Sequence, residues 1–255
     1  MSFLTVSHLS HAFGGLRAVV DFNLELSPGE LVAIIGPNGA GKTTIFNLIT
    51  GVYRPSEGEI IFRERSLVGL QPPRIVGAGI ARTFQTIRLF RELSVLDNVR
   101  IAWYGRTRYR LPEALLRLPA FTKEEARIRE RSLELLEIFG LAPFAETPSR
   151  NLPYGQQRRL EIARALATQP ALLLLDEPAA GMNPAEIGQL MDLIQRIRRE
   201  FDVTILLIEH QMRVVMGIAE RIKVLDFGQT IAEGTPTEIQ HNPRVIEAYL
   251  GEEAV

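Results

Sequence analysis

Short apolar runs alternate with helical patterns along most of the chain. The runs at 31–35 and 171–175 are each about five residues long, which suits buried strands and falls far below the roughly 20 residues of a membrane-spanning helix. Further strands are expected at 3–6, 18–26, 58–62, 203–208, 221–225 and 229–232, and helices after Gly41 and at 156–168, 184–199 and 211–217. This alternation predicts an α/β fold with a largely parallel sheet covered by helices.

One long segment lacks this alternation. From 94 to 151 the periodicity is helical, interrupted by prolines at 112 and 119 and by a basic, aromatic stretch at 103–110. We therefore expect a single domain over 1–255 in which a helical subdomain, 94–151, is inserted into a core formed by 1–93 and 152–255.

A glycine-rich loop joins the strand at 31–35 to the following helix. Its residues match G-x-x-x-x-G-K-[ST] and are Gly36, Pro37, Asn38, Gly39, Ala40, Gly41, Lys42 and Thr43, followed by Thr44. The glycines let backbone N–H groups converge on phosphate oxygens, and the helix N-terminus adds positive potential. We expect this phosphate loop to bind a nucleotide, with Lys42 on the β and γ phosphates and Thr43 on magnesium. The loop alone does not separate ATPases, GTPases and kinases.

Two carboxylates follow the apolar strand at 171–175, namely Asp176 and Glu177. Open α/β sheets bind their ligands at the carboxyl ends of their strands. In isolation such acids are more often solvated or cap a helix. Together with the phosphate loop they indicate hydrolysis, with Asp176 holding magnesium through water and Glu177 activating the attacking water.

Composition limits the classes of partner and compartment. The 255 residues carry a formal net charge of -1, so no general attraction to nucleic acid or to an anionic surface is expected. There is no cysteine, which excludes disulfides and thiolate metal sites and fits a reducing compartment. The start at Met1 lacks the pattern of a secretory signal. We expect a cytoplasmic protein.

The segment 151–166, Asn-Leu-Pro-Tyr-Gly-Gln-Gln-Arg-Arg-Leu-Glu-Ile-Ala-Arg-Ala-Leu, resembles the signature and signature helix of ABC ATPases. The resemblance implies a P-loop NTPase (RecA-like) core with an antiparallel β subdomain and a helical subdomain. It further implies ATP and Mg²⁺ as cofactors, and a dimer in which this segment meets the ATP held by the opposite subunit. Pro153 and Tyr154 depart from the common L-S-G-G-Q form, and Pro153 offers neither a hydroxyl nor a backbone N–H. The contact in trans is then expected from Leu152, Gly155 and Gln156.

The same resemblance implies roles for four residues elsewhere. Gln85 matches a glutamine that contacts magnesium and the attacking water, and His210 a histidine that contacts the γ phosphate. Phe13 resembles the aromatic residue that stacks on adenine, and an ordinary core ring is the alternative. Asn183 lies in the loop that crosses the dimer interface, where the family usually has aspartate; the amide keeps hydrogen-bonding capacity but loses the charge.

Tyr154 before Gly-Gln-Gln, and the C-terminal segments 234–236 and 242–251, resemble the larger ATPase of branched-chain amino acid importers. Such importers combine two related ATPases, two permease subunits and a periplasmic binding protein. The resemblance implies an ATPase on the inner face of the cell membrane, bound to permeases and to a second ATPase or a second copy of itself. The insertion at 103–121 is either a docking loop or a solvated face.

Three alternative functions fit the sequence less well than an amino acid importer ATPase. A non-transport ABC ATPase acting on nucleic acid or ribosomes usually has two fused cassettes or a coiled coil, whereas this chain has one phosphate loop. A P-loop kinase must exclude water, whereas Glu177 beside Asp176 suits its use. The ATPase of a lipid or lipopolysaccharide exporter is similar in size, but Tyr154 and the tail favour amino acid import.

Overall fold

The computed structural model describes residues 3–107, 109 and 111–250. Arg108 and Arg110 of the basic stretch, Gly251 of the C-terminal tail, and Met1 and Ser2 lie outside the described residues. The chain forms two compact units, one from Met1–Gln85 with Ala171–Val255 and one from Thr86–Pro170. The second unit is wider at both ends than the expected helical segment 94–151.

The first unit contains two sheets. The six-stranded sheet has the order β10-β9-β3-β8-β7-β6 and is parallel except for β10 at its edge. Its strands are β3 (Leu31–Ile35), β6 (Ile80–Arg82), β7 (Leu172–Asp176), β8 (Thr204–Ile208), β9 (Arg221–Asp226) and β10 (Gln229–Gly234). Every residue of β3, β7 and β8 is buried, which explains why these strands are apolar except for Asp176 at the end of β7 and Thr204 at the start of β8. The predicted parallel sheet is confirmed.

The smaller sheet is antiparallel, with the order β2-β1-β4-β5. Its strands are β1 (Leu4–Phe13), β2 (Leu16–Leu26), β4 (Glu57–Phe62) and β5 (Arg65–Ser66). The prediction that the first strand ends at residue 6 is wrong. Beyond Val6 the strand is irregular, with His8 at φ +51° and register shifts against β2, so the alternating pattern that marks a strand is lost there.

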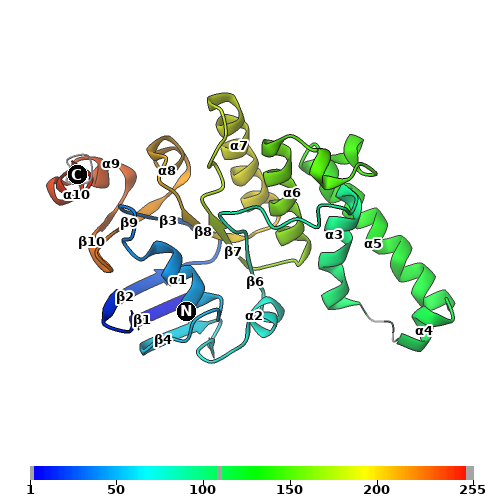
Figure 1. Cartoon of the computed structure of the whole chain (residues 1–255), viewed down its shortest axis with the longest axis horizontal. Coiled ribbons are helices and arrows are strands. Elements are labelled where there is room, and N and C mark those ends of the chain that lie inside the picture. The colour runs from blue at the N-terminus through cyan, green and yellow to red at the C-terminus, as the bar shows by residue number, and fades with distance from the viewer. Residues whose placement is uncertain (1–2, 108, 110, 251–255) are drawn as a thin grey trace. The chain divides into compact units, whose positions relative to one another are not determined.

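Helices cover both faces of the six-stranded sheet (Figure 1). Helix α1 (Lys42–Ile49) lies between the two sheets, and its Ile45, Phe46 and Ile49 join the main core. Helices α7 (Pro184–Glu200) and α8 (Met212–Ile218) lie on the opposite face. The remaining helices of this unit are α2 (Pro72–Ala78), α9 (Pro236–Gln240) and α10 (Pro243–Leu250). The predicted site residues lie at the carboxyl ends of three strands of this sheet. The phosphate loop follows β3, Glu177 follows β7, and His210 follows β8.

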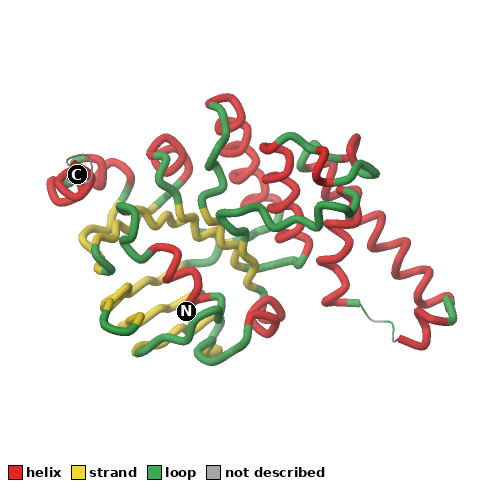
Figure 2. Tube along the Cα trace, viewed as in Figure 1, coloured by secondary structure: helices red, strands yellow, loops and turns green. Residues whose placement is uncertain are grey.

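In the described residues of the second unit, helices joined by loops form all the named secondary-structure elements (Figure 2). Helix α3 packs against both α5 and α6. The α-helices are α3 (Val95–Trp103), α4 (Leu111–Leu115), α5 (Pro119–Ile138) and α6 (Tyr154–Ala167), with 3-10 turns at Tyr104–Arg106, Ala142–Phe144 and Ser149–Asn151. In the described part of the chain, no helix has the length and apolar character required to span a bilayer.

Candidate nucleotide site

The phosphate loop connects β3 to α1 along a path that two glycines permit. Gly36 has φ +149° and Gly41 has φ +99°. A Cβ atom on Gly36 would collide with the carbonyl oxygen of Leu225, and one on Gly41 with that of Ala18. A side chain at either position would displace the loop from the neighbouring backbone.

Lys42 lies across this loop. Its Nζ donates hydrogen bonds to the carbonyl oxygens of Gly36 (2.5 Å) and Pro37 (2.8 Å), and the residue is buried. Gly41, at the N-cap of α1, supplies no side-chain cap, and the first turn of α1 contains no acidic residue. Thr43 is exposed and Thr44 half-buried. An ammonium group and an uncapped helix N-terminus thus lie together, which suits the binding of phosphate.

A cavity of about 300 to 1,000 Å³ is usual for a small-molecule site, and one of about 660 Å³ adjoins the phosphate loop. Its lining combines loop residues with β9, β10 and α10, namely Pro37, Asn38, Gly39, Ala40, Asp226, Phe227, Ile231, Arg244, Glu247 and Ala248. The C-terminal helix therefore borders the phosphate loop. No sequence pattern connects Phe227 and Arg244 to this site, because only the fold brings the end of β9 and α10 beside residues 37–40.

Asp176 ends β7 and is buried. Its Oδ2 accepts a hydrogen bond from Nη2 of Arg82, 2.8 Å away, and both side chains are almost fully buried. Arg82 also donates to Oδ1 of Asn47 on α1 at 2.7 Å. A buried guanidinium therefore fixes the end of β7 against α1 and supplies the charge that a buried carboxylate requires. No sequence motif predicts this role for Arg82.

Glu177 brings together three of the predicted site residues. Nε2 of Gln85 donates a hydrogen bond to Oε2 of Glu177 at 2.8 Å, and Nδ1 of His210 lies 3.7 Å from the same oxygen. Glu177 has φ +47°, which is uncommon for a residue with a side chain and is found more often at functional sites. Its amide donates to the carbonyl oxygen of Ile208 on β8 at 2.8 Å. The end of β7 thus turns its carboxylate toward the residues that follow β6 and β8.

A second carboxylate, Glu209, positions His210. It is fully buried and accepts hydrogen bonds from the amides of Ala179 (2.8 Å), His210 (3.0 Å) and Gln211 (3.2 Å). Burial raises the pKa of Glu209, and the backbone donors offset part of that rise. Glu209 therefore joins the loop after β7 to the loop after β8. In the sequence, only the position of Glu209 directly before His210 indicates that it belongs to the site.

Phe13, at the end of β1, keeps much of its ring accessible, with 44% of the residue exposed. It contacts His11 and Tyr53 edge to face, with centroid distances of 4.6 Å and 5.2 Å. The structure therefore places Phe13 at the surface rather than in the core, as stacking on a base requires. Phe13 does not line the cavity beside the phosphate loop.

The predicted signature residues belong to the second unit. Leu152 and Gly155 are buried, Gln156 is half-buried, and Pro153 occupies the N-cap of α6 without a side-chain cap. Tyr154 is exposed, and its hydroxyl accepts from Nη2 of Arg158 at 3.3 Å. The N-terminus of α6 carries no acidic residue in its first turn, which leaves it suited to an anion.

Asn183 caps helix α7. Its Oδ1 accepts from the amides of Ala185 and Glu186, each at 3.0 Å, while Oε2 of Glu186 accepts from the amide of Asn183 at 2.9 Å. This reciprocal arrangement is a capping box. The amide oxygen thus has a structural use within the unit in addition to the interface role predicted for it.

Known proteins with a similar sequence or fold indicate the family to which this nucleotide site belongs. Residues 19–180 match the family model described as ABC transporter. The chain belongs to the ABC transporter family. It is 49% identical over 249 residues to the high-affinity branched-chain amino acid transport ATP-binding protein LivG of Escherichia coli K12, covering 98% of each chain. Residues 229–255 match a second model, described as branched-chain amino acid ATP-binding cassette transporter.

Two solved structures share the fold of this ABC protein. The ADP conformation of an ATP-binding cassette of an ABC transporter has a TM-score of 0.86 and 30% identity, with 98% of this chain and 99% of the other covered. A dimeric post-hydrolysis state of an ATP-binding cassette bound to ADP and phosphate has a TM-score of 0.76 and 27% identity, with 91% and 98% covered. The expected ABC nucleotide-binding fold is confirmed, and the chain is an ATP-binding ATPase of this family.

Proposed function

We propose that this ABC ATPase powers the import of branched-chain amino acids. Its similarity to LivG over nearly the whole chain supports this substrate class. The match of residues 229–255 to the branched-chain amino acid model adds support from a segment outside the general ABC transporter match at 19–180. The same C-terminal match disfavours the alternative of a lipid or lipopolysaccharide exporter. The amino acid itself would contact other subunits, since the residues described above suit ATP.

The hydrogen bond from Gln85 to Glu177 is the observation that best supports the hydrolytic mechanism. Glu177 accepts the proton of the water that attacks the γ phosphate, and Gln85 keeps one carboxylate oxygen oriented. His210 lies 3.7 Å from the same oxygen and contacts the γ phosphate. Lys42 exchanges its carbonyl partners in the loop for the β and γ phosphate oxygens. Phe13 offers its exposed ring to the adenine.

The residues near the phosphate loop fit Mg²⁺. Thr43, Gln85 and Asp176 supply a hydroxyl, an amide and a carboxylate oxygen, which are the hard ligands that Mg²⁺ prefers. Among the described residues, no cluster of three or more His, Cys, Asp or Glu forms a metal site of its own. This suits an ion that is held by one or two protein oxygens together with nucleotide phosphates and water. When bound, Mg²⁺ neutralises charge that develops on the phosphates.

Hydrolysis requires a second subunit in this proposal. The likeness to a dimeric ATP-binding cassette supports such a pairing. In the dimer, Leu152, Gly155 and Gln156 at the start of α6 face the γ phosphate of the partner, and Asn183 lies at the seam. Because Pro153 has no backbone N–H, the amides after it provide the donors. The partner is either a related ATPase or a second copy of this chain.

The remaining partners follow from this role. The dimer binds two transmembrane permease subunits on the inner face of the cell membrane. A periplasmic binding protein delivers the amino acid to those permeases and never contacts this chain. Nucleic acid has no part in the cycle.

Reconstitution tests the proposal. The ATPase is assembled with its two permease subunits in proteoliposomes, with and without the related ATPase, and ATP turnover is followed as binding protein loaded with leucine, isoleucine or valine is added. We expect stimulation by these loaded proteins and uptake of the amino acid. A matched assembly carrying Lys42→Ala should show neither. If a lipid or a lipopolysaccharide stimulated ATP turnover and the loaded binding proteins did not, the proposed importer function would be wrong and the exporter alternative would take its place.

A further inference from the structure

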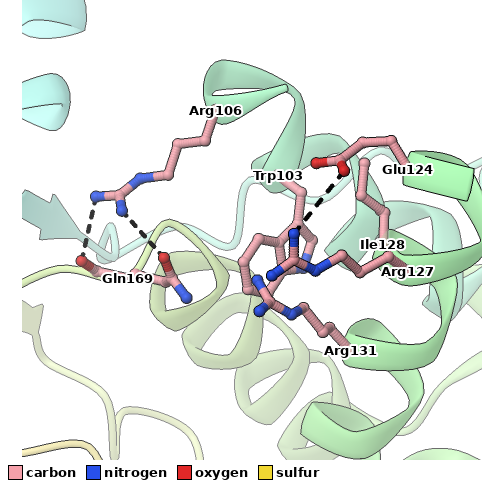
Figure 3. A pocket seen from close by; sticks show the side chains of 7 residues that line it. All are labelled: Trp103, Arg106, Glu124, Arg127, Ile128, Arg131 and Gln169. Carbon is pink, nitrogen blue, oxygen red and sulfur yellow. Dashed lines mark hydrogen bonds and ion pairs between the residues drawn. The ribbon is translucent and has the colours of Figure 1, made fainter. Parts of the chain in front are cut away.

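A cavity of about 300 Å³ lies within the helical unit, apart from every residue assigned to nucleotide chemistry. It is bordered by the end of α3 and the 3-10 turn that follows, by residues 124–131 of α5, and by Gln169, two residues after the end of α6 (Figure 3). We call it the arginine pocket, after three of its lining residues, Arg106, Arg127 and Arg131. The size suits a small ligand or the polar head of a larger one.

The arginine pocket carries an excess of positive charge. Its lining contains three arginines and a single carboxylate, Glu124. That carboxylate lies 4.0 Å from Arg127. In the described part of the chain, neither Arg106 nor Arg131 has a carboxylate within ion-pair distance. Two guanidinium charges are therefore uncompensated around one cavity, and an anion is the ligand that would balance them.

Neutral groups hold these arginines in place. Nη1 of Arg106 donates to Oε1 of Gln169 at 3.0 Å and Nη2 to its carbonyl oxygen at 3.4 Å. The guanidinium of Arg131 lies over the Trp103 ring, 5.5 Å from its centroid. Figure 3 shows the side chains of Arg127 and Arg131 extending from α5 to the indole. The guanidinium groups of Arg106 and Arg131 are thus oriented without being neutralised. This favours the binding of an anion, because these side chains lose little further entropy when the anion binds.

Trp103 adds a further donor. It lines the pocket, and its Nε1 is buried with no hydrogen-bond partner among the described residues. A buried indole N–H usually has a partner. A ligand with several acceptor oxygens would satisfy this donor together with the forked donors of the arginines, and a phosphate group has that chemistry.

We propose that the arginine pocket binds a phosphate-bearing anion. Two sources can deliver the phosphate, namely a soluble phosphate compound or the headgroup of an anionic phospholipid. The lipid source has support from the neighbouring sequence, because Leu111, Leu115 and Leu116 precede α5 and are 84%, 82% and 68% exposed. Exposed leucines beside arginines are typical of segments that lie on an anionic membrane surface.

The fluorescence of Trp103 tests the pocket directly, because it is the single tryptophan of the chain. The full-length protein is titrated with inorganic phosphate and with glycerol 3-phosphate at constant ionic strength, against chloride. We expect a saturable change in emission that persists in Lys42→Ala, where the phosphate loop is disabled. Absence of a saturable change with both compounds and with the vesicles described below would overturn the proposal.

Substitutions identify the groups that bind. Arg127→Gln and Arg131→Gln should each weaken the affinity about tenfold, as expected for the loss of a charge-assisted hydrogen bond. Arg129→Gln is the matched control, since this arginine lies on the same helix but pairs with Glu146 at 3.1 Å and does not line the pocket. Basal ATP turnover should match wild type in all three, which checks folding. If one variant does not fold, Arg106→Gln takes its place. Equal weakening by the control would contradict the assignment.

Vesicles separate the two sources. Sedimentation with phosphatidylcholine vesicles is compared with and without added phosphatidylglycerol. Binding that requires phosphatidylglycerol and is lost in Arg127→Gln and Arg131→Gln assigns a lipid headgroup to the pocket. Titration by glycerol 3-phosphate without vesicle binding assigns a soluble phosphate compound. Vesicle binding that survives both substitutions, together with no response to soluble phosphate, would show that the pocket has no part in it.

Discussion

The side-chain amide of Gln85 donates a hydrogen bond to the carboxylate of Glu177, with Nε2 and Oε2 2.8 Å apart. Gln85 follows β6 and Glu177 follows β7, so two strand ends meet at this bond. Gln85→Ala should lower kcat about 10- to 100-fold, the effect of removing a hydrogen bond to a charged group, with ATP affinity near that of wild type. Steady-state ATPase assays and ATP titrations check this. Gln229→Ala, an exposed glutamine on β10, is the control and should be silent.

Gly36 is predicted to tolerate no side chain. In Gly36→Ala the new methyl group would collide with the carbonyl oxygen of Leu225 at a positive φ. We expect a loss of about 3 kcal/mol or more in the free energy of unfolding, together with loss of ATP binding. Gly77→Ala, inside α2 with open space around it, should instead stabilise by about 0.5 to 1 kcal/mol. Urea unfolding measures both, and equal effects would refute the argument.

Asn183 should contribute to stability as a helix cap. Asn183→Ala removes the acceptor of two amides at the start of α7 and should cost about 1 kcal/mol. Asn183→Asp restores an acceptor and should keep wild-type stability. Thermal unfolding of the two variants, beside the exposed helix control Asp192→Ala, separates a capping role from a general effect of substitution. Asn183→Asp as unstable as Asn183→Ala would exclude capping.

Glu233 should make the stability depend on pH. It lies opposite Lys223 in the β9–β10 pair and forms ion pairs with Lys223 and Arg221. Burial alone would raise the pKa of Glu233, but these two cations together lower it from 4.5. The unfolded chain then binds the proton more readily, so this stabilisation is present above pH 4.5 and is lost as the pH falls through the lowered value.

The corresponding variant is Glu233→Gln. It should show a smaller fall in unfolding free energy across this acid range, with a difference of about 1 kcal/mol or less because the pair is partly exposed. Denaturant titrations at a series of pH values measure it. Glu59→Gln, exposed on β4, should leave the pH profile unchanged. A profile for Glu233→Gln identical to wild type would mean that the cations do not stabilise the carboxylate.

The sequence predicted those parts of the fold and site that depend on local patterns. The apolar runs of β3, β7 and β8 and the phosphate loop have strong local signatures, and the strands form where they were expected. The irregular second half of β1 escaped prediction, because His8 in a left-handed conformation breaks the alternation. The sequence also did not predict that the helical unit extends to 86–170. The apolar period of α6 predicts a helix but does not indicate which unit the helix packs in.

Residues that act through distant partners were missed for a related reason. Arg82 reaches Asp176 across 94 positions, and Glu209 reaches the amide of Ala179 across 30. The arginine pocket collects its side chains from residues 103 to 169. Spacing along the chain carries no record of such contacts, so only the folded arrangement reveals them.

The most direct test of the account is ATP turnover by Glu177→Gln. Glutamine keeps an oxygen that can accept from Gln85 but cannot take a proton from water. We predict a fall in kcat of about 100-fold or more, retained ATP binding, and an ATP-bound dimer on gel filtration. Turnover close to that of wild type in this variant would contradict the assignment of Glu177 as the base.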